Sequence, residues 1–193
     1  MPSEVYKRIL ILCGGQTELQ YAKAIKQILP RQVQRNIDID IDSYKKKDPL
    51  NLAKEARRRK RKARAEKNAY DRIWLFFDND NKPNLIEAFN IIFREDFSFS
   101  YSSICIEFWF LLHYKDTGRA FQNCHEVINQ LKKYLPHYHK TKINHFEILS
   151  NNVGTAKNRA QRIRTMYGNI VDYSTTNPYT SVDELIDFFL LKN

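Results

Sequence analysis

The sequence lacks the features that mark membrane, secreted and zinc-binding proteins. No apolar run reaches the roughly 18 residues needed to cross a bilayer, and the opening MPSEVYKR has no apolar signal-peptide core. The cysteines are odd in number and show no C-x-x-C spacing; they are Cys13, Cys105 and Cys124. These absences predict a protein of the reducing cytoplasm with no membrane contact, no zinc site and no disulfide framework.

Glycine motifs for nucleotides are also missing. The chain has 5 glycines, and they form neither GxxxxGK[ST] nor GxGxxG, so no motif supports bound ATP or NAD. The pair Gly14-Gly15 stands at the junction of an apolar run and a helical pattern. Glycines there either permit a tight turn or let a phosphate approach backbone N–H groups at the helix start.

Positive charge, by contrast, is abundant. Lys and Arg number 32 against 22 for Asp and Glu, which gives a formal net charge of +10. Such a balance predicts a polyanionic partner, and nucleic acid is the first candidate. The composition does not distinguish RNA from DNA.

Much of this charge lies in one predicted helix. Residues 54–67 contain nine basic residues and two acids, too many to be neutralised along one solvent face. A second stretch, 137–142, mixes tyrosine with histidine and lysine, which suits stacking on single-stranded or looped RNA. For the helix over 54–67, the alternatives are a merely solvated surface helix and a helix that binds an acidic partner protein. The predicted phosphate contacts are Arg57, Arg58, Arg61, Lys62, Arg64 and Lys140.

Strand and helix patterns alternate along the first two thirds of the chain. This order predicts an α/β fold with a mostly parallel, Rossmann-like sheet flanked by helices. One domain, 1–193, is expected, with an α/β core over about 1–118 and a helical extension over about 119–193 packed on the flank of the sheet. Strands are predicted at 8–13, 37–44, 73–77 and 99–106, and helices at 18–29, 48–67, after Pro83, and at 107–114, 121–134, 145–167 and 181–191.

Acidic residues follow three of the predicted strands. Asp78 and Asp80 come directly after 73–77, Glu18 follows the first strand, and Glu107 follows the fourth. Parallel strands end at one edge of a sheet, so these carboxylates are expected to converge, and a divalent cation is the usual relief for their repulsion. Mg²⁺ or Mn²⁺ suits such oxygen ligands. The alternatives are turn-forming Asp residues and ordinary acids at helix starts.

Four stretches of the chain resemble a known family. The chain is similar to the RloB-like proteins, which are related to the AbiLii abortive-infection proteins and to the wider Toprim-like group. The resemblance implies a Toprim-type metal-dependent nuclease with a role in bacterial defence against phage, beside an ATPase encoded in the same locus. The stretches are 9-ILILCGGQTELQYAKAIK-26, 73-IWLFFDNDN-81, 101-YSSICIEFWFLLHY-114 and 177-NPYTSVDELIDFFL-190.

The family's motifs carry over to individual positions. Glu18 falls in the first acidic motif, Asp78 and Asp80 form the D-x-D, and Glu107 is the acid of the third motif. The resemblance implies catalytic roles for all four, with Glu18, Asp78 and Asp80 as metal ligands. His113 closes the third motif; its own pattern predicts burial against the sheet, and the aromatic residues around Trp109 are predicted to lie in the core.

One position departs from the family pattern. Gly14 stands where the first motif usually has a glutamate before its glycine. Three hypotheses therefore stay open: a nuclease for host or phage nucleic acid such as transfer RNA, a catalytically inactive module that binds nucleic acid or a partner protein, and a phosphohydrolase of nucleotides. The oligomeric state, a homo-oligomer included, is not determined by the sequence.

Overall fold

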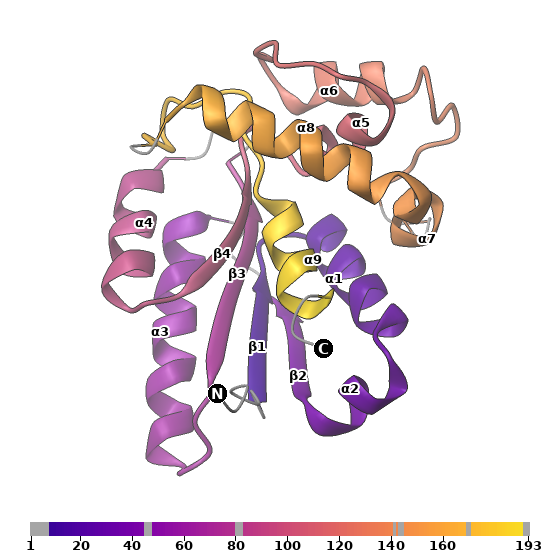
Figure 1. The fold of residues 1–193 in the computed structure, drawn as a ribbon. Coiled ribbons are helices and arrows are strands. Elements are labelled where there is room, and N and C mark those ends of the chain that lie inside the picture. Colours follow the sequence, from indigo (N-terminus) through magenta and orange to yellow (C-terminus); the bar gives the residue numbers. More distant parts are fainter. Residues whose placement is uncertain are drawn as a thin grey trace.

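Four parallel strands form the centre of the protein. The computed structural model describes residues 8–44, 48–79, 83–140, 142, 145–168 and 171–190. Within them the sheet order is β2-β1-β3-β4, and every neighbouring pair is parallel. All strands therefore end at one edge, here called the carboxyl edge (Figure 1). The strands are β1 (Arg8–Cys13), β2 (Asp38–Ser43), β3 (Arg72–Asp78) and β4 (Ser98–Ser102).

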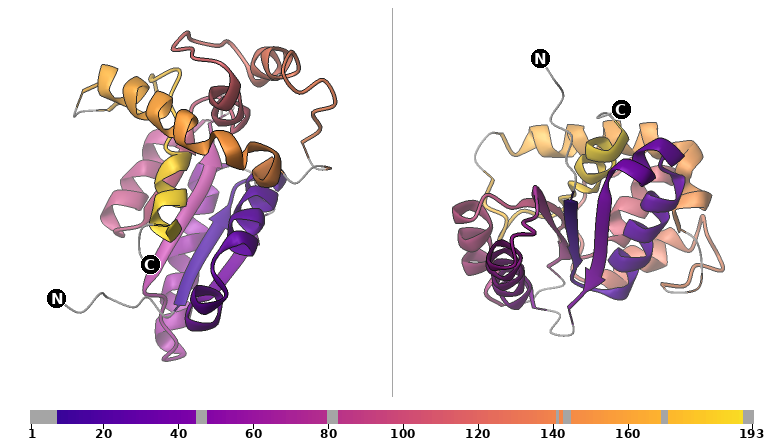
Figure 2. Two further views of the ribbon diagram at one scale, coloured as in Figure 1. Left: turned by 45° about the vertical axis from the view of Figure 1, so that its right-hand side comes forward. Right: turned by 90° about the horizontal axis from the view of Figure 1, so that it is seen from below.

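Helices cover both faces of this sheet. Helices α1 (Gln16–Ile28) and α9 (Val182–Leu190) lie on one face, and α3 (Pro49–Ala65) and α4 (Leu85–Arg94) lie on the other (Figures 1 and 2). Side chains alternate along a strand, so β1 contributes to both layers: Ile9 and Ile11 pack on the α1 side, and Leu10 and Leu12 on the α3 side. The predicted α/β, Rossmann-like class is confirmed.

The helices after β4 do not pack on the flank of the sheet, as the sequence had suggested. They lie beyond the carboxyl edge, and only α9 returns to the sheet face (Figures 1 and 2). The reason is α5, whose residues 107–113 are all buried, so that neighbours are needed on every side. We call α5 to α8 the helical cap: α5 (Glu107–Tyr114), α6 (Cys124–Leu131), α7 (His145–Leu149) and α8 (Val153–Met166).

Local chemistry changes two predicted elements, and one helix was not predicted. β4 ends at Ser102, before the predicted 106, because Ile104 has φ 73° and breaks the extended conformation. The helix predicted over 145–167 is interrupted by a 3₁₀ turn, Ser150–Asn152, whose short polar side chains compete for backbone groups. Helix α2 (Arg31–Asn36) was not predicted, since it buries none of its residues and has no apolar periodicity.

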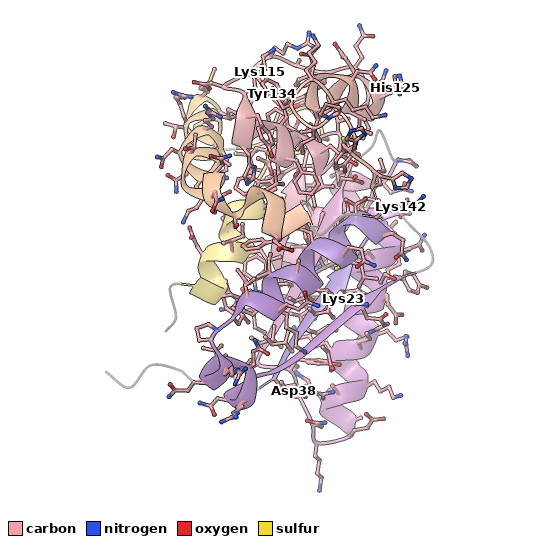
Figure 3. All side chains as sticks on the ribbon, turned by 90° about the vertical axis from the view of Figure 1, so that its right-hand side faces the viewer. Lys23, Asp38, Lys115, His125, Tyr134 and Lys142 are labelled. Carbon is pink, nitrogen blue, oxygen red and sulfur yellow. A yellow bond between two sulfur atoms is a disulfide. The ribbon has the colours of Figure 1, made fainter. Side chains whose placement is uncertain are left out.

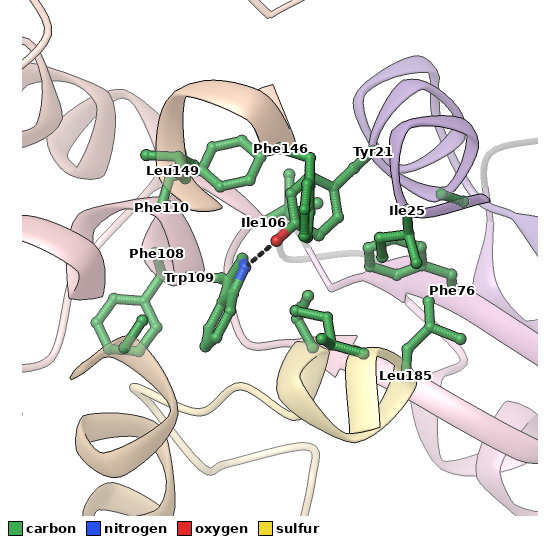
Figure 4. Close-up of a cluster of buried hydrophobic side chains, with 14 of the residues drawn as sticks. Tyr21, Ile25, Phe76, Ile106, Phe108, Trp109, Phe110, Phe146, Leu149 and Leu185 are labelled. Atoms are coloured by element: carbon green, nitrogen blue, oxygen red, sulfur yellow. Dashed lines mark hydrogen bonds between the residues drawn. The ribbon is translucent and has the colours of Figure 1, made fainter. Parts of the chain in front are cut away.

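The cap and the sheet share one hydrophobic core. Tyr21 of α1 accepts a hydrogen bond from Trp109 of α5 at 2.8 Å, with Phe146 of α7 and Leu185 of α9 in the same cluster (Figure 4). The predicted burial of the Trp109 region is confirmed.

Among the described residues, no helix is both long enough and apolar enough to cross a membrane.

The prediction of no disulfide was wrong. Cys105, just before α5, is bonded to Cys124, the first residue of α6, with their Cα atoms 5.6 Å apart. Spacing along the chain could not reveal this pair, because the turn at Ile104 and the loop before α6 bring the two positions together. Cys13 is free and buried at the end of β1.

Candidate metal centre at the carboxyl edge

The two glycines after β1 fit the chain tightly against β3. The Gly14 N–H donates to the Phe76 carbonyl at 2.8 Å, and a Cβ on Gly14 would lie 3.0 Å from the Phe77 Cβ. A Cβ on Gly15 would lie 2.5 Å from Oε2 of Glu18. The pair thus lets α1 begin beside the end of β3 and leaves room for the Glu18 carboxyl group.

Glu18 and Asp78 meet at this junction. Glu18 is 4% exposed, and Asp78, the last residue of β3, is half-buried. Burial raises the pKa of Glu18 well above its usual value, and the charge of Asp78, with a hydrogen bond between the two side chains, raises it further. The two carboxyl groups therefore share one site.

The topology explains why the two acids meet there. The chain runs from β1 outward to β2, then returns across the sheet to β3 on the other side of β1. The crevice between β1 and β3 is a topological switch point, which is where open α/β sheets bind ligands. Glu18 and Asp78 come from the two elements that border it.

Glu107 approaches the same site from the cap. The turn through Ile104 directs α5 over the carboxyl edge, and the Glu107 side chain is buried. The charge of Glu107 also raises the pKa of Glu18. The structure thus brings Glu18 and Asp78 into contact and places Glu107 close enough for its charge to act on Glu18, whereas Asp80 lies outside the described residues.

Both oxygens of Glu107 already have neighbours in the cap. The Tyr138 hydroxyl donates to Oε1 at 2.9 Å, and Nζ of Lys140 lies 3.4 Å from the same atom. Oε2 lies 3.3 Å from Sγ of Cys124. Because its oxygens have these neighbours, Glu107 is not free to act as a further metal ligand. Its negative charge still acts on Glu18.

Two residues of the 137–142 stretch have different surroundings from those predicted. Tyr138 is buried on Glu107, so it is not a stacking platform for bases. Lys140, predicted to contact phosphate, lies against Glu107 with its side chain 49% exposed. The sequence reasoning missed Tyr138 as a partner of the acidic site; its position among charged residues was the available signal, but stacking was preferred.

The donor set fits Mg²⁺ or Mn²⁺ at Glu18 and Asp78. Both are carboxyl oxygens in close contact, and Mg²⁺ in proteins is often held by one or two carboxylates together with water and phosphate. A different trio of described residues has its ligand atoms within 4.8 Å of one another: Cys105, Glu107 and Cys124. Its two sulfurs are bonded to each other, so that trio is not free to coordinate an ion.

The basic helix α3 begins near the carboxyl edge but leads away from it. It follows the end of β2 and ends at Ala65; just beyond it, the Asn68 carbonyl accepts from Arg8 at the start of β1. Arg58 and Arg59 both hydrogen-bond Glu55, at 2.8 and 2.9 Å. The predicted contacts Arg61, Lys62 and Arg64 are exposed on the half of α3 that is remote from the acids, and the half-buried Arg57 lies nearer its middle.

Comparison with known proteins found one matching family. The family described as RloB-like protein matches residues 9–189, nearly the whole chain and all of its described strands except the first residue of β1. A search of curated proteins found no match.

Proposed function

Because this chain belongs to the RloB-like protein family, we propose that it is a divalent-metal-dependent nuclease of the Toprim type, which hydrolyses phosphodiester bonds in RNA or DNA. Its setting would be bacterial anti-phage defence in the cytoplasm, beside an ATPase partner from the same locus. The observation that carries the proposal is the contact between the Glu18 and Asp78 carboxyl groups at the switch point.

Each acid has a distinct part in this proposal. Glu18 and Asp78, with Asp80, would hold Mg²⁺ or Mn²⁺. When bound, the ion would supply charge neutralisation for a phosphate and would lower the pKa of a coordinated water. Glu18 is suited to exchange a proton, because burial and the neighbouring Asp78 raise its pKa. Glu107, held by Tyr138, would position negative charge behind the pair.

The position of Gly14 favours a second candidate, a catalytically inactive module that binds nucleic acid or a partner protein. The family's usual glutamate is absent there, and a Cβ at that position would be crowded at 3.0 Å from Phe77. A glutamate could therefore be accommodated only if β3 shifted. In the nuclease proposal, Glu18 takes over the acid–base work of the first motif.

The decisive experiment compares Asp78→Asn with Asp38→Asn. Both residues belong to parallel strands, but Asp38 starts β2 and lies at the opposite end of the sheet from the cap residues His125 and Lys142 (Figure 3). Calorimetry would measure Mn²⁺ binding, and gel assays with Mn²⁺ would measure cleavage of transfer RNA, single-stranded DNA and plasmid. Asp78→Asn is expected to abolish Mn²⁺ binding and slow cleavage by at least about 100-fold, with salt-sensitive nucleic-acid binding retained.

The outcomes separate the two candidates. Asp38→Asn should behave as the wild type, because it removes only an exposed carboxylate 3.5 Å from Arg8. Cleavage by Asp78→Asn at the wild-type rate would refute the proposed site. A wild-type protein that binds nucleic acid but neither binds Mn²⁺ nor cleaves, with or without its ATPase partner, would favour the inactive module.

A further inference from the structure

Cys105 and Cys124 occupy a position that the nuclease proposal does not use. Their bond joins the residue just before α5 to the first residue of α6, and α5 begins two residues after Cys105 with Glu107. The Cα separation of 5.6 Å lies within the usual range for disulfides. Closing or opening this bond therefore acts on the segment that carries Glu107.

The sulfur of Cys124 has two partnerships that exclude each other. It is bonded to Cys105, and it also lies 3.3 Å from Oε2 of Glu107, a hydrogen-bonding distance for a thiol donor. A disulfide sulfur carries no proton, so this hydrogen bond can form only in the reduced protein, and the 3.3 Å approach is a contact without a donor in the oxidised one. Oxidation leaves Glu107 with Tyr138 and Lys140, both on Oε1.

Changing the partners of Glu107 matters because its side chain is fully buried. A buried carboxylate depends on the protein for every hydrogen bond, since water does not replace a lost donor. Its charge already acts on Glu18 at the carboxyl edge. Losing the thiol donor therefore increases the negative potential that Glu107 imposes on the Glu18 and Asp78 pair.

We propose that Cys105 and Cys124 are an oxidation site, at which a peroxide closes a disulfide that strengthens divalent-metal binding by the neighbouring carboxylates. The bond itself is independent of the proposed function, whereas its effect on the metal rests on it. Cys124, a residue with 8% exposure against 1% for Cys105, is the more exposed of the two and is therefore assigned as the first to react with peroxide.

The reaction is balanced by the peroxide alone. The Cys124 sulfur attacks the O–O bond, an S–O bond forms, and one water leaves. The Cys105 sulfur then attacks the resulting sulfenic acid, the S–S bond forms, and a second water leaves. The two thiols lose two electrons and two protons, and the peroxide takes up both. A small dithiol reverses the change by thiol–disulfide exchange.

The first test locates the bond. Full-length protein, reduced with dithiothreitol and freed of it, would be treated with hydrogen peroxide, unfolded and alkylated with N-ethylmaleimide for mass spectrometry. The reduced protein should take up label at all three cysteines, and the oxidised protein only at Cys13, with a linked Cys105–Cys124 peptide. Cys13→Ser should still form this peptide and Cys124→Ser should not. Full labelling after peroxide, or a bond between two molecules, would overturn the inference.

The second test measures Mn²⁺ affinity of both redox forms by calorimetry. Oxidation should tighten Mn²⁺ binding about tenfold, the scale of one hydrogen bond to a charged group, and Cys124→Ser should show no response to peroxide. Equal affinities would overturn the inference and leave the metal site standing. Absence of Mn²⁺ binding in both forms would refute the proposed function together with this effect. If the reduced protein bound stoichiometric zinc, and this zinc protected both sulfurs from alkylation, the two cysteines would form a metal site. That result would also overturn the inference.

Discussion

At the scale of single residues, Gly15 and Glu18 are matched to each other. Glu18 is three positions after Gly15 and folds back over it within the first turn of α1, so a side chain at position 15 and the carboxyl group would compete for one space. The flexible Glu18 side chain, rather than the backbone, is what would have to move. Gly15 is thus required by the candidate site and not by a left-handed backbone, since its φ is −152°.

Substituting Gly15 should therefore separate metal binding from stability. In Gly15→Ala, the Cβ would displace the Glu18 carboxyl group, and we expect Mn²⁺ affinity to fall about tenfold or more, with unfolding free energy changed by less than about 1 kcal/mol. Gly154→Ala is the control, because no atom lies within 4 Å of the added Cβ. It should leave Mn²⁺ binding unchanged. Calorimetry and urea unfolding provide the two measurements; unaltered Mn²⁺ affinity in Gly15→Ala would contradict the geometry.

His113 is the second residue whose surroundings determine a measurable property. It is buried, although within the cap and not against the sheet as predicted, and its Nδ1 hydrogen-bonds the Trp109 carbonyl at 3.0 Å. Burial, the largest cause, and the charge of Arg159 together lower the pKa of His113 to about 4. The folded protein thus favours the neutral ring, whereas the unfolded chain protonates it near pH 6.5. The associated stability is present above pH 6.5 and is lost as the pH falls towards 4.

His113 should accordingly make the protein acid-sensitive. Between pH 7 and pH 5 the wild type should lose about 2 kcal/mol of unfolding free energy through this group. His113→Gln should be less stable than the wild type at pH 7 but should lose less on acidification. His125→Gln, at an exposed position of α6, is the control. Urea unfolding at the two pH values tests this, and an identical pH dependence in His113→Gln and the wild type would refute it.

At the scale of elements, α3 is less available for nucleic acid than its composition suggests. Arg59 bridges Glu55 and Asp42 of β2, at 2.9 and 2.6 Å, and Lys60 binds Glu95 after α4 at 3.0 Å. The hydrogen bonds from Arg58, the largest cause, and from Arg59 lower the pKa of Glu55 to about 2. Part of the charge on α3 therefore attaches the helix to its neighbours, and only its outer residues can contact phosphate.

The outer arginines of α3 give a direct prediction. Reversing Arg61 and Arg64 to Glu should weaken binding of duplex nucleic acid and reduce the slope of log affinity against log salt by about 2, since each phosphate contact contributes roughly 0.9. Mn²⁺ affinity should not change, because this half of α3 is remote from the acids. Reversal of the exposed Arg31 and Arg35 of α2 is the matched control. A slope equal to that of the wild type would exclude this face.

At the scale of the whole molecule, the cap and the sheet are one folding unit. The hydrogen bond between Tyr21 and Trp109 crosses from the α1 layer to the cap. The end of the chain also returns to the sheet: Thr180 pairs with Ser102 of β4, and Arg164 of α8 forms two 2.6 Å bonds with the Asp183 carboxylate at the start of α9. The acidic site lies between these parts and depends on both.

Division of the chain near residue 118 should therefore fail. A fragment 1–118 would expose the apolar surface of α5, which packs against α6 and α8 in the full chain. We expect it to be unfolded or aggregated, with no cooperative urea transition. A fragment 1–190 should unfold as the whole protein does. Circular dichroism and light scattering would show the difference; a cooperatively folded 1–118 fragment would establish an independent α/β domain.

The sequence by itself determined the order of elements and the kind of chemistry. Apolar runs such as 73–77 are long enough to require burial, and their alternation with helical patterns permits few arrangements other than a parallel α/β sheet. It also determined that Glu18, Asp78 and Glu107 lie at or after the carboxyl ends of strands, although the end of β4 at Ser102 was not visible locally. These predictions depend only on neighbours along the chain.

Only the tertiary structure decided what surrounds those acids. The cap over the carboxyl edge, the enclosure of Glu107 by Tyr138 and Lys140, and the bond between Cys105 and Cys124 all join positions 17 to 33 residues apart. Such contacts arise because α5 is buried by neighbouring segments on all its sides, and that burial depends on packing in three dimensions. No local pattern carries that information, because the same residues could have been solvent-exposed in another arrangement of the same helices.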